Sequence, residues 1–270
     1  MRLPSGLTVR VVECGPRDGR PVVLLPGWAV SAFTYRHQLP ALGAAGYRAT
    51  AVDLKGHGFS DKPIGRGEYT FETMARHVEE VVGAFATRPA VVVGQSMAGA
   101  LAIQLATTRR DLVSALVLIG PVGLGVIPFI RAAVLLTPRL VDPVAPYLAR
   151  RGVVRAGLRL VYADPRRITE DTVDEYWAPA QFPAYARALR ALVHDFRWAP
   201  FPDPTLTMLD ERTLVVFGAR DRLVRNAEWR VRRLVGPTVV LVDDAGHAVN
   251  EEQPDVVNAD MLQFLRRLAV

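Results

Sequence analysis

Four short apolar stretches, separated by segments of helical periodicity, constrain the fold of this 270-residue chain more than any other feature. Each stretch is a continuous, mostly apolar run and does not alternate regularly with polar positions. A strand that is apolar at every position is buried on both faces, and helical crossovers between such strands make them parallel. The sequence therefore predicts an α/β fold with a doubly wound, mostly parallel sheet. The four strands are expected at residues 21–25, 47–54, 90–94 and 115–119.

The segments around these strands predict further elements. A strand is expected at residues 7–14, and Arg17-Asp18-Gly19 has the composition of a hairpin turn that would join it to the next strand. Thr70 is a candidate N-cap for a helix whose apolar residues recur three and four positions apart. The other expected elements are helices at 31–45, 70–86, 97–108, 225–234 and 254–268, and strands at 214–217 and 238–242.

The regular alternation stops between about residues 120 and 201. This part of the chain is rich in Arg, is interrupted by Pro, and carries no strand pattern. Helical spacing is confined to residues 154–162, 172–177 and 185–196. We therefore expect one core domain formed by residues 1–121 and 202–270, with residues 122–201 as a helical insertion.

The segment Val91–Gly99 predicts a reactive serine. An apolar strand ends at Gly94, Ser96 follows two residues later, and a helical stretch begins at once. A sharp turn between strand and helix exposes the serine hydroxyl, and the free amides of the helix N-terminus can stabilise an oxyanion. The usual pattern for such a turn is G-x-S-x-G, whereas this chain has Ala98 at the last position. A structural turn or N-cap serine is the alternative interpretation.

Two further residues could complete a catalytic triad with Ser96. In a parallel sheet, side chains that act together lie on loops after the carboxyl ends of strands. Asp221 and His247 each follow one of the last two predicted strands, in the chain order Ser, Asp, His. Asp243 and Asp244 compete for the acid role, but their closeness to His247 in the sequence fits solvated positions better. The other histidines, which fit the role of base less well, are His37, His57, His77 and His194.

Taken together, these motifs resemble the α/β-hydrolase fold family, over essentially the whole chain. Besides the serine turn, three segments resemble family motifs: residues 24–28 (L-L-P-G-W), 53–63 (D-L-K-G-H-G-F-S-D-K-P) and 246–254 (G-H-A-V-N-E-E-Q-P). The resemblance implies a serine hydrolase, of carboxylesterase or lipase type, with residues 122–201 as a helical cap. It also implies an oxyanion hole formed by the backbone N–H groups of Trp28 and Met97. Related dehalogenases and epoxide hydrolases need a carboxylate nucleophile, and here that position is Ser96.

Composition excludes several other classes of protein. The net charge of +6 comes from dispersed arginines without a basic run, so no nucleic-acid partner is expected. Cys14, the single cysteine, cannot form an intramolecular disulfide. No uninterrupted apolar run is long enough for a membrane span, so stable membrane insertion is not expected. No signal peptide is visible either, and we therefore expect a cytoplasmic location. Neither metal-binding spacing nor a nucleotide-binding glycine motif occurs, so no metal or cofactor is expected.

The predicted activity is hydrolysis of a small-molecule carboxylic ester with an apolar portion. An apolar pocket is expected because the insertion is rich in large apolar residues; its candidate residues are Trp28, Phe129, Trp177 and Phe182. Arginines of the insertion could instead bind a substrate carboxylate, the candidates being Arg131, Arg155, Arg159 and Arg190. Alternative reactions on the same triad are lactone opening, carbon–carbon bond hydrolysis, thioester hydrolysis and perhydrolysis. A non-catalytic small-molecule receptor is the alternative from another class.

Overall fold

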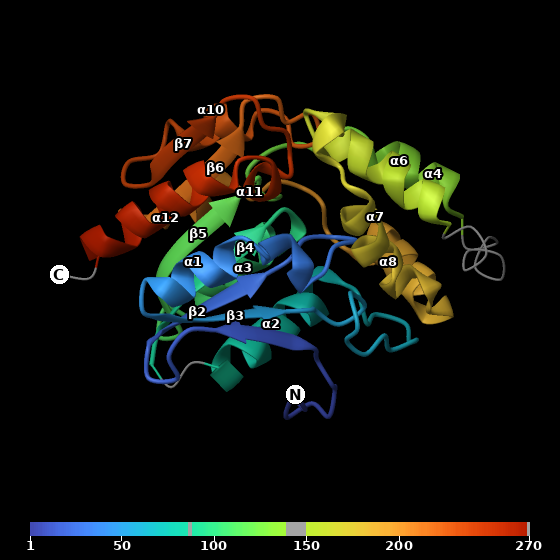
Figure 1. Ribbon diagram of the computed structural model, residues 1–270, viewed down its shortest axis with the longest axis horizontal. Coiled ribbons are helices and arrows are strands. Elements are labelled where there is room, and N and C mark those ends of the chain that lie inside the picture. Colours follow the sequence, from blue (N-terminus) through green and yellow to red (C-terminus); the bar gives the residue numbers. More distant parts are fainter. Residues whose placement is uncertain (86–87, 139–149, 269–270) are drawn as a thin grey trace.

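The computed structural model, which describes residues 1–85, 88–138 and 150–268, contains a seven-stranded sheet (Figure 1). The strand order is β1-β3-β2-β4-β5-β6-β7, and every neighbouring pair is parallel except β1 with β3. The predicted doubly wound, mostly parallel sheet is therefore confirmed. The strands are β1 (Val11–Cys14), β2 (Arg20–Leu25), β3 (Tyr47–Val52), β4 (Ala90–Gln95), β5 (Val113–Ile119), β6 (Thr213–Gly218) and β7 (Thr238–Val242).

The predicted hairpin between the first two strands is wrong. β1 pairs with β3, and β3 lies between β1 and β2. The connection passes closely over the start of β3, since a Cβ at Gly15 would lie 2.0 Å from the carbonyl oxygen of Tyr47. β2 is buried along nearly its whole length and needs a neighbour on each side, whereas the half-buried β1 suits the edge of the sheet.

Helices cover both faces of the sheet (Figure 1). Alternate residues of one strand enter different cores: Val92 packs in the cluster that includes α2 (Phe71–Phe85) and α3 (Met97–Thr108). Val91 and Val93 pack in the cluster that includes α1 (Gln38–Ala44) and α12 (Pro254–Leu268). This double burial explains why the central strands are apolar along most of their length. No helix in the described part of the chain is long and apolar enough to cross a membrane.

The starts of two predicted helices show how local signals act. Thr70 caps α2 as predicted, because its hydroxyl accepts a hydrogen bond from the Thr73 amide at 3.3 Å. The helix expected at 31–45 is instead divided into a 3₁₀ turn, η1 (Ala32–Tyr35), and α1. Pro40 has no N–H to donate to the carbonyl four residues earlier, so it is tolerated in the first turn of α1 but not inside a longer helix.

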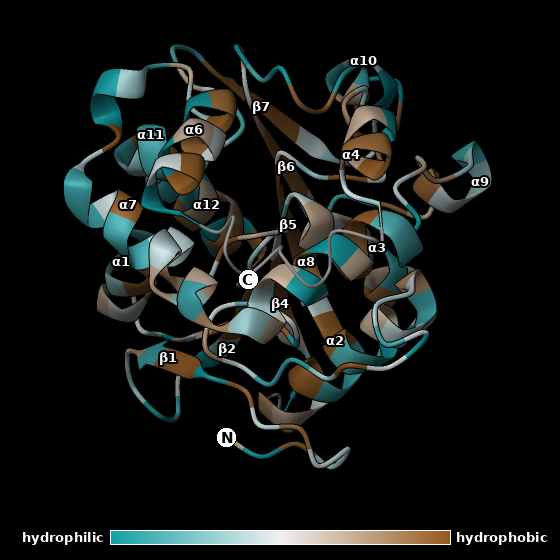
Figure 2. Cartoon of the chain, turned by 90° about the vertical axis from the view of Figure 1, so that its right-hand side faces the viewer, coloured by the Kyte–Doolittle hydropathy of each residue, from teal (hydrophilic) through white to brown (hydrophobic). Residues whose placement is uncertain are grey.

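The segment between β5 and β6 is helical and, in its described residues, contains no strand. Its helices lie beyond the carboxyl ends of the parallel strands, and α8 is in front of the sheet when this end faces the viewer (Figures 1 and 2). We refer to α4 (Ile130–Leu136), α6 (Arg151–Val161), α7 (Glu170–Trp177) and α8 (Pro183–Asp195) as the cap helices. The boundaries at residues 121 and 201 stay predictions. The other helices among the described residues are η3 (Pro165–Arg167), η4 (Pro179–Gln181), α9 (Asp203–Leu206), α10 (Ala227–Val231) and α11 (Val249–Glu252).

Strand β4 and helix α3 approach each other as closely as the serine turn requires. A Cβ at Gly94 would lie 2.7 Å from the carbonyl oxygen of Ala98 and 2.8 Å from the Cβ of Ala102. Ala98 itself is fully buried. The backbone position that the G-x-S-x-G pattern reserves for small residues is therefore tightly packed here.

This packing makes substitutions of Ala98 informative. We expect Ala98→Gly to stay active, with the free energy of unfolding lowered by no more than about 1 kcal/mol through helix propensity. Ala98→Leu should cost about 1–3 kcal/mol by overpacking and should lower turnover by displacing the first turn of α3. Thermal melts and ester turnover of both variants test this. A stable, fully active Ala98→Leu protein would contradict the close approach.

Candidate active site

Ser96 lies at the turn between β4 and α3 in a strained backbone conformation. Its φ is +51°, a left-handed value that residues other than glycine rarely adopt. Backbone hydrogen bonds fix this conformation: the Ser96 amide donates to Ile119 O at 2.9 Å, and Ser96 O accepts from the amides of Gly99 and Val122, each at 2.9 Å. Such strain persists only where the surroundings hold it, and it is concentrated at functional sites.

The three residues of the predicted triad meet at the carboxyl end of the sheet. Ser96 Oγ lies 2.7 Å from His247 Nε2, and His247 Nδ1 lies 2.9 Å from Asp221 Oδ2. The side chains come from the loops after β4, β6 and β7; β6 and β7 are neighbours in the sheet, and β5 separates β6 from β4. The structure thus brings Ser96, His247 and Asp221 into a single hydrogen-bonded chain, in which imidazole can take the serine proton.

The surroundings of Asp221 favour the ionised form of its carboxyl group. Its Oδ1 accepts hydrogen bonds from the amides of Leu223 at 2.8 Å and Val224 at 3.2 Å. Burial opposes ionisation, but His247 and these two amides outweigh it and hold the pKa of Asp221 below its usual value. The rival carboxylates Asp243 and Asp244 are exposed, and Asp244 forms an ion pair with Arg220. The geometry therefore places Asp221 in the orienting position.

The loop that carries Trp28 lies directly against the serine turn. A Cβ at Gly27 would be 2.8 Å from Ser96 Cβ, and the Gly27 amide donates to Gln95 Oε1 at 2.9 Å. In the described part of the chain, neither the Trp28 nor the Met97 amide has a recorded backbone or side-chain acceptor. The role of both amides in an oxyanion hole stays a prediction. Gln95 was not predicted from the sequence, where its only signal was its position between Gly94 and Ser96.

The indole of Trp28 joins this loop to the cap helices. Its Nε1 donates to Leu189 O of α8 at 3.1 Å, and the Tyr185 hydroxyl of the same helix donates to Ala29 O at 3.0 Å. Ala29 has a left-handed φ of +64°, so the loop turns sharply after Trp28. Helix α8 is therefore fixed to the loop beside Ser96 at two points.

The other predicted pocket residues differ in how far they are exposed to solvent. Phe129 is 37% exposed at the start of α4, and Phe182 is 50% exposed and packs edge-on against Phe59 at 6.0 Å. Trp177 is half-buried at the end of α7. These positions do not assign the three residues to a pocket, and their part in one stays a prediction.

The arginines considered for a substrate carboxylate lie elsewhere. Arg155 forms an ion pair with Glu170 on the surface between α6 and α7. Arg131 and Arg159 are exposed on α4 and α6. Arg190, on α8, already interacts with another group of the protein. These positions give little support to an anionic substrate.

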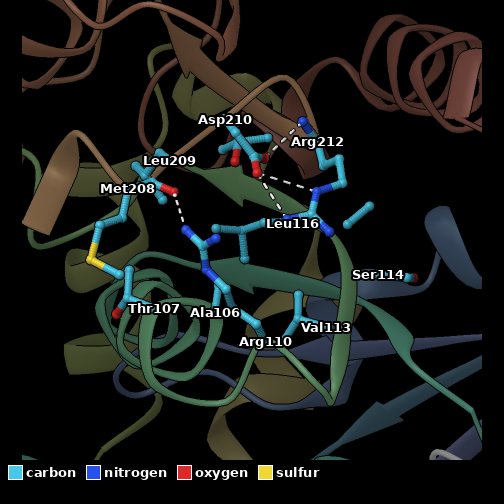
Figure 3. A pocket seen from close by; sticks show the side chains of 12 residues that line it. Ala106, Thr107, Arg110, Val113, Ser114, Leu116, Met208, Leu209, Asp210 and Arg212 are labelled. Atoms are coloured by element: carbon cyan, nitrogen blue, oxygen red, sulfur yellow. Dashed lines mark hydrogen bonds and ion pairs between the residues drawn. The ribbon is translucent and has the colours of Figure 1, made fainter.

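The hollow drawn in Figure 3 is separate from the triad. It is lined by Val113 and Thr213, which begin β5 and β6, so it lies at the amino end of the sheet, opposite the triad. Its volume of about 20 Å³ leaves room for little more than one water molecule. The nearby Arg212 is paired with Asp210 (Figure 3).

His57 and His77 serve the fold rather than the chemistry. Both are buried, and they hold the backbone of Lys55 from two sides: its amide donates to His77 Nε2 at 3.0 Å, and its carbonyl lies 3.1 Å from His57 Nδ1. Burial lowers the pKa of His57 to about 4, and burial together with Lys55 lowers that of His77 to about 3. Both rings are therefore neutral in the folded protein at neutral pH.

These two histidines predict a loss of stability in acid. Below pH ~6.5 the unfolded chain protonates both rings while the folded protein does not, so the free energy of unfolding should fall as pH drops from about 6.5 to 4. The expected slope is on the order of 1 kcal/mol per pH unit for each histidine. Urea unfolding at pH 7 and pH 5 measures it. His57→Asn should be less stable at pH 7 but lose less on acidification, and an unchanged slope would contradict the assignment.

Comparison with known proteins agrees with this arrangement. A model of the alpha/beta hydrolase family matches residues 22–260. The chain is 26% identical to the AB hydrolase superfamily protein YfhM of Bacillus subtilis, covering 97% of this chain and 96% of the relative. It is 31% identical to the putative carbamate hydrolase RutD of Variovorax paradoxus, covering 94% and 95%. The crystal structure of CarC, a serine hydrolase involved in carbazole degradation, superposes with a TM-score of 0.79 at 26% identity, covering 97% and 96%. The chain therefore belongs to the alpha/beta hydrolase family.

Proposed function

We propose that this protein is a cofactor-independent serine hydrolase of carboxylic esters. The observation that carries the proposal is the unbroken chain from Ser96 Oγ through His247 to Asp221. A serine hydroxyl is a weak nucleophile unless a base within hydrogen-bond reach takes its proton, and the base needs an orienting group. All three roles are filled, and the nucleophile is on a strained turn at a helix N-terminus.

The reaction proceeds through an acyl-enzyme. His247 Nε2 takes the Ser96 proton as Oγ attacks the carbonyl carbon, and the amides of Trp28 and Met97 stabilise the oxyanion. The imidazolium, stabilised by Asp221, then gives its proton to the departing alcohol. Water, activated by the same histidine, attacks the acyl-enzyme and releases the acid.

A neutral substrate with an apolar portion fits the surroundings of the triad. Helix α8 is joined to the Trp28 loop and packs with apolar residues of the main core, including Leu192. Of the four arginines considered as carboxylate ligands, one is paired, two are exposed and one already interacts with another group of the protein, which favours a neutral ester over an anionic acid. We assign Trp28, Phe129, Trp177 and Phe182 to the apolar pocket as part of this proposal.

Hydrolysis of a carbamate is the second candidate. It is supported by the identity of 31% to the putative carbamate hydrolase RutD over nearly all of both chains. The same triad can attack a carbamate carbonyl, because the oxyanion and the proton transfers are alike.

A substrate panel tests both candidates. Purified protein is assayed with p-nitrophenyl esters of graded acyl length, an aryl carbamate, a lactone, a thioester and a dienone acid. We expect the highest kcat/KM with an ester and a dependence on acyl length. Faster turnover of the carbamate would establish the second candidate, and turnover of only the lactone, thioester or dienone acid would contradict both. No turnover of any compound would favour a non-catalytic receptor.

A further inference from the structure

The loop that carries His247 is held by the cap segment as well as by the sheet. The amides of His247 and Ala248 both donate to the carbonyl oxygen of Val161, the last residue of α6, at 2.8 and 3.3 Å. A Cβ at Gly246 would lie 2.6 Å from the same oxygen, so the two segments touch backbone to backbone. The position of the catalytic base therefore depends on where the end of α6 lies.

Glu252 fastens these two segments together. Its Oε1 accepts a hydrogen bond from the Gly246 amide at 2.7 Å. Its Oε2 accepts from the amides of Ala163 at 2.8 Å and Asp164 at 3.2 Å, just after α6. The side chain is almost fully buried, with 2% of the residue exposed. One carboxylate thus satisfies three backbone donors on both sides of the junction, and charged acceptors make stronger hydrogen bonds than neutral ones.

We propose that Glu252 is a positioning residue for His247, which keeps Nε2 within reach of Ser96 by locking the 246–247 backbone to residues 161–164. The inference rests on the proposed function, since it assigns His247 the role of base. Glu252 touches neither the serine nor the substrate-facing amides in its recorded contacts, and acts through the backbone at Gly246. A shift of about 1 Å in a catalytic group lowers rates on the order of a hundredfold.

The neighbouring Glu251 provides a matched control. It is also buried and also joins the core to the cap, because it accepts hydrogen bonds from Thr34 at 2.9 Å, Tyr162 at 2.9 Å and Tyr176 at 2.7 Å. Arg36 pairs with it as well. Its recorded contacts do not include the 246–247 loop. A change at Glu251 therefore removes a similar buried carboxylate while the bonds of Glu252 to the amides of Gly246, Ala163 and Asp164 stay in place.

The experiment compares Glu252→Gln with Glu251→Gln in the full-length protein. A glutamine at 252 has one acceptor oxygen for donors on two sides, so one side must be released. We expect kcat for a p-nitrophenyl ester to fall on the order of a hundredfold in Glu252→Gln, with KM changed less than threefold. We expect kcat to fall less than about fivefold in Glu251→Gln, even if the melting temperatures of the two variants are lowered equally relative to the wild type.

A readout without substrate separates this inference from the proposed function. The proton between His247 Nδ1 and Asp221 should give a far-downfield NMR signal in the wild type, shifted or broadened in Glu252→Gln and retained in Glu251→Gln. If Glu252→Gln does not fold, Gly246→Ala replaces it, since its Cβ would meet Val161 O and push the loop away. An unchanged signal and kcat in the position-252 or position-246 variant, or equal losses of kcat in both glutamate variants, would overturn the proposal. A wild type that is inert to every ester would overturn the proposed function, and the NMR comparison would still decide the role of Glu252.

Discussion

Ser96→Ala is expected to lower ester turnover by about a million-fold while leaving the protein folded. The loss is this large because the members of a triad act as a unit, so that removing the nucleophile removes nearly the whole of its contribution. Folding should be unaffected, since the Ser96 side chain is only partly buried and its recorded hydrogen bond is to His247. Steady-state kinetics and thermal melting measure the two effects, and His247→Ala should be about as damaging.

A fluorophosphonate probe identifies the nucleophile directly. It should label the wild type and fail to label Ser96→Ala. Ser60→Ala is the matched control, because Ser60 is buried and its hydroxyl is engaged with the carbonyl of Asp53 and the amide of Arg10. That variant should lose stability and keep its labelling. If the probe still labelled Ser96→Ala, the nucleophile would have to be elsewhere in the chain.

The central sheet was predictable because its signal is local. A run such as Val91–Val93 is apolar at each position, since alternate side chains enter the two cores on opposite faces of the sheet. A run of consecutive apolar residues therefore predicts that both faces of the strand are buried. The helices between the strands carry their own signals, such as the Thr70 cap of α2, so element type and order could be read together.

The order of strands at the edge of the sheet was not predictable in the same way. Arg17-Asp18-Gly19 does form a turn, in which the Gly19 amide donates to Pro16 O. The chemistry of a turn fixes the local direction of the chain, but not which strand lies beside the next one. The chain passes over the start of β3 at Gly15, and nothing within the turn itself encodes that contact.

The residues of the candidate site show the same difference between local sequence signals and long-range contacts. Ser96, Asp221 and His247 could be found because each follows a strand, and the carboxyl ends of parallel strands meet at one edge. Gln95 and Glu252 could not, because their roles depend on contacts with distant segments. Glu252 joins Gly246 to residues 163 and 164, more than 80 positions away from it in the sequence. Pairing of this kind is visible only once the cap segment is placed against the core.

Asp221→Asn is expected to lower kcat on the order of ten-thousandfold with little loss of stability. An asparagine keeps the oxygen that accepts the Leu223 and Val224 amides, but it can present N–H₂ to His247 Nδ1. That arrangement favours the tautomer with the proton on Nε2, which then cannot accept the proton of Ser96. Asp244→Asn is the control: its exposed side chain pairs with Arg220, and asparagine tolerates its left-handed φ of +55°. Kinetics of both variants at neutral pH decide the assignment, since activity retained in Asp221→Asn but lost in Asp244→Asn would transfer the acid role to Asp244.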